Sequence, residues 1–107
     1  MGFQFNNGIP PVLLSSSPSN NQINVSINSN IVLYFSRPVF VENGNITIKR
    51  LDNNLVFETI LANDTSKVTR NLDIVTINPS GTFENNTKYY INISNTSFHN
   101  GFDDFYL

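Results

Sequence analysis

The segment 28–39, which reads NSNIVLYFSRPV, constrains the fold more than any other part of the chain. Isoleucine, leucine and phenylalanine occupy every second position from Ile31 to Phe35, so they fall on one face of an extended chain. This period of two is typical of a β-strand with one buried face. Pro38 ends the run, because proline cannot donate a hydrogen bond to a ladder. The segment therefore predicts a central strand of a small antiparallel sheet.

Shorter runs with the same alternation follow along the chain, separated by turn-forming residues. Asp52, Asn53 and Asn54 tolerate left-handed backbone geometry and so predict a hairpin turn. No stretch of eleven residues shows a helical period. Short strands about ten residues apart indicate an all-β fold, and we expect an antiparallel β-sandwich of about seven strands. The other strands are expected at 12–14, 23–27, 46–50, 55–61, 72–78 and 88–94, with a polar segment at 63–66.

Length and composition limit the number of domains and the classes of partner. A chain of 107 residues can form one domain with one core, which we place at residues 10–107 behind an N-terminal arm at residues 1–9. The net charge of −2 and the scattered basic residues argue against nucleic-acid binding. The lack of cysteine excludes disulfides and thiolate metal sites. No apolar run approaches the ~20 residues of a membrane span, and no signal-peptide pattern is visible at the N-terminus.

Patterns that would carry catalysis are sparse. His99 is the one histidine, so the sequence offers neither a histidine pair for zinc nor a Ser–His–Asp set, and we expect this side chain at the surface. No carboxylate pair or Gly-rich phosphate loop occurs. Asn100, Asp103 and Asp104 form an oxygen-rich cluster that could bind calcium, the alternative being a solvated turn. The sequence therefore predicts a protein that is not an enzyme, with no cofactor other than calcium at that cluster.

Several short motifs occur in a fixed order along the chain. They comprise Ser17, Pro18, Val25, Ile31, Leu33, Phe35, Ser36, Pro38, Val39, Val75, Ile77, Pro79, Thr87 and Tyr89. Their order is similar to that of bacterial Ig-like repeats of the kind found in S-layer proteins. The resemblance implies an Ig-like β-sandwich in which Phe35, Pro38 and Tyr89 are structural residues, with Tyr89 as the corner tyrosine, whose hydroxyl bonds to nearby backbone. It also implies a non-catalytic module of a cell-surface or extracellular protein.

The two ends of the sequence depart from that family pattern. Members of the family continue beyond a turn, which corresponds here to residues 100–104, into one more strand, whereas this sequence ends at Leu107. Residues 1–6 carry Phe3 and Phe5 on one face and resemble the last strand of a preceding repeat. The resemblance therefore implies that the last strand of the sandwich comes first in this sequence.

A strand at residues 1–6 would not easily complete its own sandwich. Residues 7–11 span at most ~17 Å, whereas the strand itself is ~20 Å long and the linker would have to return along it. We therefore hypothesise that copies assemble head to tail, with each N-terminal strand completing the next sandwich at an open edge beside residues 89–94. The alternative is that residues 102–107 form the last strand. The interface expected from this hypothesis comprises Phe3, Phe5, Tyr90, Asn92, Phe102, Phe105 and Tyr106.

Two other functions remain open at the level of sequence. Without a signal peptide, the chain could be a virion protein such as a phage head decoration or tail accessory protein. The aromatic residues at 90, 102, 105 and 106 could stack on sugars, as in a carbohydrate-binding module. The expected partners are therefore other copies or neighbouring repeats, with a glycan as the alternative. The expected location is extracellular or at the cell surface, with the virion as the alternative.

Overall fold

The computed structural model describes residues 11–19, 22 and 25–99. These residues form strands and connecting turns, and none of them is helical. The predicted all-β fold is therefore confirmed, while the predicted arm at residues 1–9 lies outside the described residues. The strands are β1 (Leu13–Ser17), β2 (Ile31–Phe35), β3 (Phe40–Val41), β4 (Asn45–Arg50), β5 (Val56–Leu61), β6 (Val68–Asn71), β7 (Ile74–Ile77), β8 (Tyr89–Ile93) and β9 (Phe98–His99).

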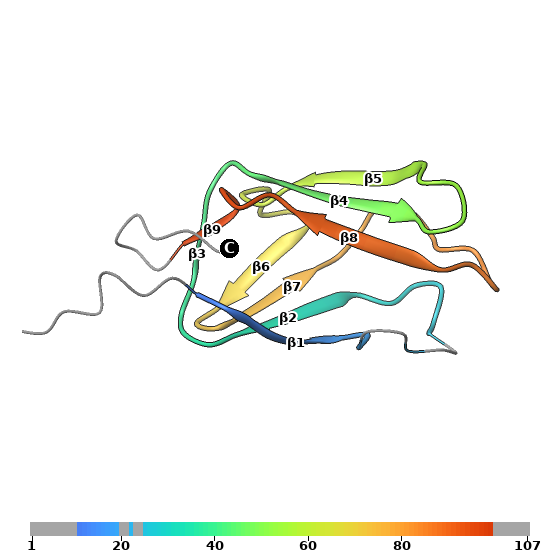
Figure 1. Ribbon diagram of the computed structural model, residues 1–107. Coiled ribbons are helices and arrows are strands. Elements are labelled where there is room, and N and C mark those ends of the chain that lie inside the picture. Colours follow the sequence, from blue (N-terminus) through green and yellow to red (C-terminus); the bar gives the residue numbers. More distant parts are fainter. Residues whose placement is uncertain (1–10, 20–21, 23–24, 100–107) are drawn as a thin grey trace, which may run out of the picture.

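Two antiparallel sheets form the layers of an Ig-like sandwich (Figure 1). One sheet has four strands in the order β1-β2-β7-β6, and the other has three in the order β5-β4-β8. The two-residue strands β3 and β9 pair with each other at one end. The predicted number of about seven strands is therefore that of the two layers, and the β3–β9 pair is additional.

The segment that alternates most clearly in the sequence lies at the centre of the four-stranded sheet. β2 pairs with β1 on one side and β7 on the other, and Ile31, Leu33 and Phe35 are at most 6% exposed. The ring of Phe35 packs against Phe98, with ring centroids 5.2 Å apart. The strand ends at Phe35, and Pro38 lies exposed in the loop that follows.

Three sequence-based assignments of strands are wrong. β6 falls in a segment that was not predicted as a strand, and it forms because its backbone pairs with β7 although Val68 is its one buried residue. The predicted strand at 72–78 begins at Ile74, since Leu72 lies in the turn with a φ of 58°. Residues 25–27, which were expected to form part of a strand, are not in one.

The alternation expected at the start of β1 is shifted by one residue. Leu13 packs against the core, whereas Val12 and Leu14 are 55% and 67% exposed. A bulge between Leu13 and Ser15 causes the shift, because an extra residue in one strand exchanges its two faces.

The two sheets face each other in a defined alignment. Lys67, which directly precedes β6, contacts Glu58 of β5 with an N–O distance of 3.4 Å, so these two edge strands lie on the same side. The strand orders then place β4 against β7 and β8 against β2. Since four strands face three, β1 has no facing strand within the described part of the chain.

Candidate strand-acceptor edge

β8 is the outer strand of the three-stranded sheet on the side of β1. It pairs with β4 in a regular register from Tyr89 opposite Arg50 to Ile93 opposite Ile46. Ile46 and Ile48 of β4 are fully buried, but Ile91 and Ile93 beside them are only partly buried, although they pack against the same core. The hydrophobic core is therefore incompletely covered along β8 in the described structure.

The backbone of β8 offers hydrogen-bonding groups on that same side. The N–H of Ser94 donates to the carbonyl of Asn45 at 2.9 Å, and the N–H of Leu51 donates to the carbonyl of Lys88 at 2.9 Å. Bonded pairs alternate in an antiparallel ladder, so residues 90 and 92 face β4 with their backbone groups. The N–H and C=O groups of residues 89, 91 and 93 point away from β4. No described strand pairs with them.

The start of β8 is fixed by aromatic packing and one hydrogen bond. The Tyr89 hydroxyl accepts a hydrogen bond of 2.9 Å from the backbone N–H of Glu84, which is the arrangement of a tyrosine corner. Its ring lies 5.3 Å from that of Phe57 and 4.8 Å from that of Phe83. The strand is thus held in place independently of any neighbour on its outer side.

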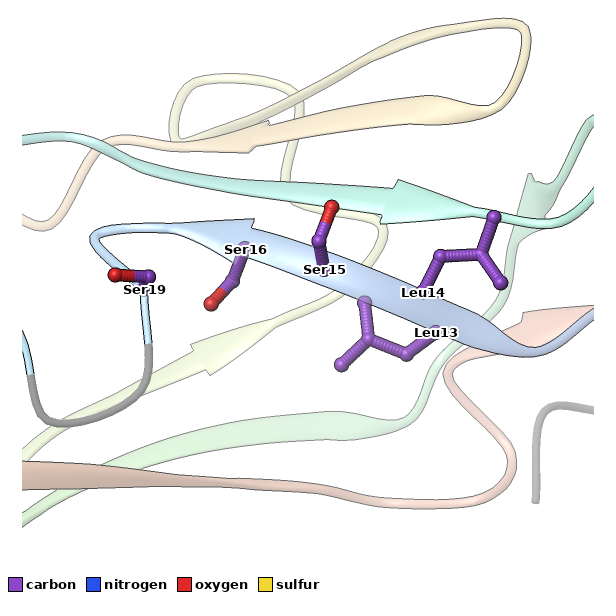
Figure 2. Close-up of a pocket in the computed structure, with 5 residues that line it drawn as sticks. All are labelled: Leu13, Leu14, Ser15, Ser16 and Ser19. Carbon is purple, nitrogen blue, oxygen red and sulfur yellow. The ribbon is translucent and has the colours of Figure 1, made fainter.

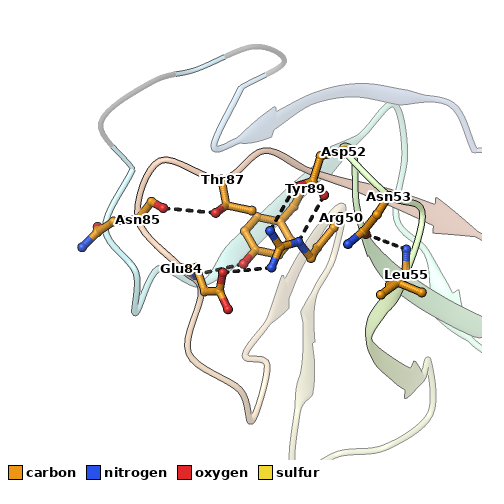
Figure 3. Close-up of polar contacts among 8 residues, drawn as sticks. All are labelled: Arg50, Asp52, Asn53, Leu55, Glu84, Asn85, Thr87 and Tyr89. Carbon is orange, nitrogen blue, oxygen red and sulfur yellow. Dashed lines mark hydrogen bonds and ion pairs between the residues drawn. The ribbon is translucent and has the colours of Figure 1, made fainter.

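Polar contacts hold the adjoining loops at this end of the sandwich (Figure 3). Arg50 binds Asp52 at 3.0 Å and Glu84 at 2.9 Å, and its hydrogen bonds hold the pKa of the Asp52 carboxyl below its usual value. The Tyr90 hydroxyl donates to the side-chain oxygen of Asn54 at 2.9 Å. Asn54 has a φ of 59°, as expected for the predicted hairpin turn at residues 52–54.

β5, the opposite edge of the same sheet, carries features that block strand addition. Its ladder with β4 is interrupted by a register shift between Ile48 and Lys49. Glu58 lies on its core-facing side, directly across from Ile48, and accepts hydrogen bonds from the N–H groups of Ser80 and Gly81 at 2.9 and 2.8 Å. Bulges and inward-pointing charges are features with which natural sheets prevent pairing at an edge.

The two edges of the four-stranded sheet carry similar blocking features. β1 contains the bulge after Leu13 and lies between Pro11 and Pro18. β6 has only four residues, among them the exposed Arg70. β8, in contrast, reads YYINI and contains no proline, no charge and no bulge, and its nearest charged neighbour, Lys88, precedes the strand. Of the four edges of the two main sheets in the described structure, β8 is therefore the one suited to accept another strand.

The predicted interface residues are only partly described. Tyr90 and Asn92 lie on the outer face of β8, Tyr90 half-buried and Asn92 exposed. The sequence did not single out Ile91 and Ile93, whose alternation placed them simply in the core. Predicted residues outside the described part of the chain are Phe3, Phe5, Phe102, Phe105 and Tyr106 of the interface and Asn100, Asp103 and Asp104 of the calcium cluster.

The described residues contain no cluster of metal-ligating side chains. No group of three or more His, Cys, Asp or Glu side chains lies close enough together there to hold a metal. His99 was expected at the surface, but its side chain is only 13% exposed and lies 3.1 Å from Glu42. It lies there because β9 pairs with β3, which brings the imidazole beside the ring of Phe40 with ring centroids 5.8 Å apart.

Two open hollows occur on the described surface. The first runs along β1, where Leu13 and Leu14 leave the strand on opposite sides, and it is lined by Leu13, Leu14, Ser15, Ser16 and Ser19 (Figure 2). The second is lined by Leu51, Asp52, Asn86, Thr87 and Lys88. Neither lining contains a histidine or a pair of carboxylates.

Comparison with known proteins identifies one family. The profile described as bacterial Ig-like domain matches residues 7–100. No significant match was found among curated proteins or among solved structures. No helix in the described part of the chain is suited to cross a membrane. Domains of this kind are typically non-enzymatic structural modules and are commonly exposed on surfaces. The matched region, the sandwich and its strand order together show that the chain belongs to the bacterial Ig-like domain family.

Proposed function

We propose that this chain is a structural and interaction module of a surface or extracellular assembly, related to S-layer repeats, in which copies join head to tail through their N-terminal strands. The observation that supports this function is the edge of β8. It combines outward backbone groups with partly covered core residues and lacks the features that block pairing at the other edges.

Strand addition at this edge would contribute two kinds of interaction. Main-chain hydrogen bonds to residues 89, 91 and 93 would provide affinity without regard to sequence. The apolar side chains of the added strand would cover Ile91 and Ile93, and burial of apolar surface contributes about 25 cal/mol per Å². Since neither interaction depends on charge, the association would be almost insensitive to salt.

The test is the mass of the full chain in solution as a function of concentration, measured by analytical ultracentrifugation at low and high salt. A head-to-tail contact joins two different surfaces, so it does not stop at a dimer, and we expect a series of species that lengthens with concentration. A chain that stays monomeric throughout the accessible concentration range would overturn the proposal.

The carbohydrate-binding alternative has less support from the described residues. Tyr90 is the one predicted sugar-stacking residue among them, and it is half-buried with its hydroxyl bonded to Asn54. Stacking on a sugar requires an accessible ring face. A virion location would use the same β8 edge, so it differs from the proposal in setting and not in the site. Labelling of intact cells and of purified particles with an antibody distinguishes these settings.

A further inference from the structure

We infer that the outer side of β8, opposite β1, accepts residues 1–6 of a second copy as an antiparallel strand. This inference rests on the proposed head-to-tail assembly and specifies its site, its occupant and its direction. The occupant follows from the side chains that the edge requires, and the choice of a second copy follows from the length of the connection to β1 and the direction of the added strand.

The position beside β8 requires a strand with apolar residues on one face. An added strand continues the pleat of its neighbour, so the residues beside Ile91 and Ile93 would point into the core. They would lie between these two residues and Leu13 of β1, which is itself partly buried. The outer face would continue the surface that contains the exposed Asn92 and would be polar.

Residues 1–6 meet this requirement, and residues 102–107 do not. In MGFQFN, one face of an extended strand carries methionine and two phenylalanines, while the other carries glycine, glutamine and asparagine. In FDDFYL, Asp103 and Asp104 are adjacent, so each face of a strand contains one carboxylate. A carboxylate without a partner is costly to bury in an apolar core. The N-terminal segment is therefore the better occupant.

For a strand antiparallel to β8, the directions of the strands favour a segment from another copy. β1 begins at the end of the sandwich where β8 finishes, because Leu13 pairs with Phe35 and Phe35 packs on Phe98 just after β8 (Figure 1). A strand antiparallel to β8 starts at that same end and finishes about 20 Å away. The connection to the start of β1 at Leu13 comprises residues 7–12 and spans at most about 22 Å. It would have to be almost fully extended to lead back from there, so self-completion in this direction is strained.

In a second copy the linker has no such return to make. The donating copy would lie beyond the β4–β5 turn of the accepting copy, with its own β1 leading away from that turn. Its β8 would then be available for a third copy. The contact joins different surfaces of successive copies and therefore propagates as a chain or closes as a ring.

Disulfide trapping tests this placement, because the chain contains no cysteine of its own. One protein sample carries Gln4→Cys, and it is mixed with a second sample that carries Asn92→Cys or Tyr90→Cys. Two positions on β8 are tested because a disulfide forms only between residues almost directly opposite each other. Thr59→Cys on β5 is the matched control. Thr59 and Asn92 both pair with Thr47 and are both exposed, so they lie in one row at opposite edges of the sheet.

We expect mixed dimers of Gln4→Cys with one of the two β8 variants, at a yield several times that with Thr59→Cys. Association of the full chain without preferential trapping on β8 would overturn this site and leave the proposed assembly intact. An intramolecular disulfide in the double variant Gln4→Cys/Asn92→Cys at high dilution would show that the chain fills its own edge. The same result with Asp104→Cys/Asn92→Cys would assign the edge to residues 102–107. Either result would overturn the inference.

Discussion

The two outer strands of the three-stranded sheet, β5 and β8, flank the same central strand but differ in the core-facing residue that each places beside Ile48. Ile48 of β4 has Glu58 of β5 on one side and Ile91 of β8 on the other. This core-facing row therefore ends in a carboxylate at the β5 edge and in an alkyl side chain at the β8 edge. In the next row, Thr47 lies between Thr59 and Asn92. In this outer row the two edges are alike, and the difference lies in the core-facing row that contains Ile48.

Glu58 closes the β5 edge by binding groups from two other segments. Its carboxylate accepts the N–H groups of Ser80 and Gly81 and lies 3.4 Å from the ammonium of Lys67, so that its side chain is only 12% exposed. The carboxylate is fully paired in the isolated domain, but a strand added to β5 would disturb these hydrogen bonds and this ion pair. The comparison teaches that a sheet can direct assembly to one edge by placing a satisfied charge at the other.

The largest expected effect comes from replacing that charge. Glu58→Leu removes the acceptor for two N–H groups and the partner of Lys67, and hydrogen bonds to charged groups contribute about 1.5–3 kcal/mol each. We expect the free energy of unfolding to fall by about 2–3 kcal/mol, since water can reach the exposed loop. We also expect aggregation, because β5 would lose its inward charge. Urea unfolding and light scattering measure the two effects.

Glu58→Gln is the control for this substitution, because it keeps an oxygen acceptor and a polar inner face. It should lose less stability and remain as soluble as the parent chain. Equal aggregation of the two variants would mean that the inward charge does not protect β5.

The second prediction concerns the backbone of β8. Ile91→Pro removes an N–H that points away from β4, so the existing ladder is retained, but the ring blocks the approach of a further strand. We expect association of the full chain to weaken by about 2 kcal/mol, or about thirtyfold, relative to Ile91→Ala. Ile91→Ala loses similar packing and keeps the N–H, so equal association of the two variants would contradict pairing at this edge. Sedimentation of both variants is the measurement.

The third prediction uses pH to separate the two edges. Burial raises the pKa of the Glu58 carboxyl, but hydrogen bonds from Ser80 and Gly81 and the charge of Lys67 lower it by more, so the net shift is below the ordinary value of 4.5. The unfolded chain therefore binds more protons than the folded chain just below that value, and stability falls as the pH drops through the folded pKa.

Urea unfolding from neutral to acidic pH should show this loss in the parent chain and a smaller loss in Glu58→Gln. A slope remains in the variant, because the pKa values of Asp52 and Asp64 are also lowered. β8 contains no carboxylate, amine or imidazole, so association should change little over the range in which the chain stays folded. Identical slopes in parent and variant would contradict the role of Glu58.

The sequence predicted the fold class, the central strand and the strand that became β8, because each alternates over five residues without interruption. It failed at β6, where one buried valine gives no pattern, and at β1, where a bulge exchanges the faces. The protection of the β5 edge against strand addition could not be predicted from the sequence, because Glu58 binds the N–H of Ser80, which lies 22 residues away in the chain. The suitability of β8 as an acceptor likewise emerges only when the four edges of the two main sheets are compared.

The smallest expected effect comes from the outer row through Thr47, in which the two edges are similar. Asn92→Lys places a charge that edge strands commonly use against pairing, and the lysine would remain solvated while a neighbouring strand approaches. We expect association to weaken by about 0.5–1 kcal/mol, a few-fold change in the dissociation constant. Thr59→Lys adds the same charge in the same row, and it should leave association unchanged. An equal effect of the two lysines would indicate a general contribution of net charge, whereas an effect of Thr59→Lys alone would assign the interface to β5.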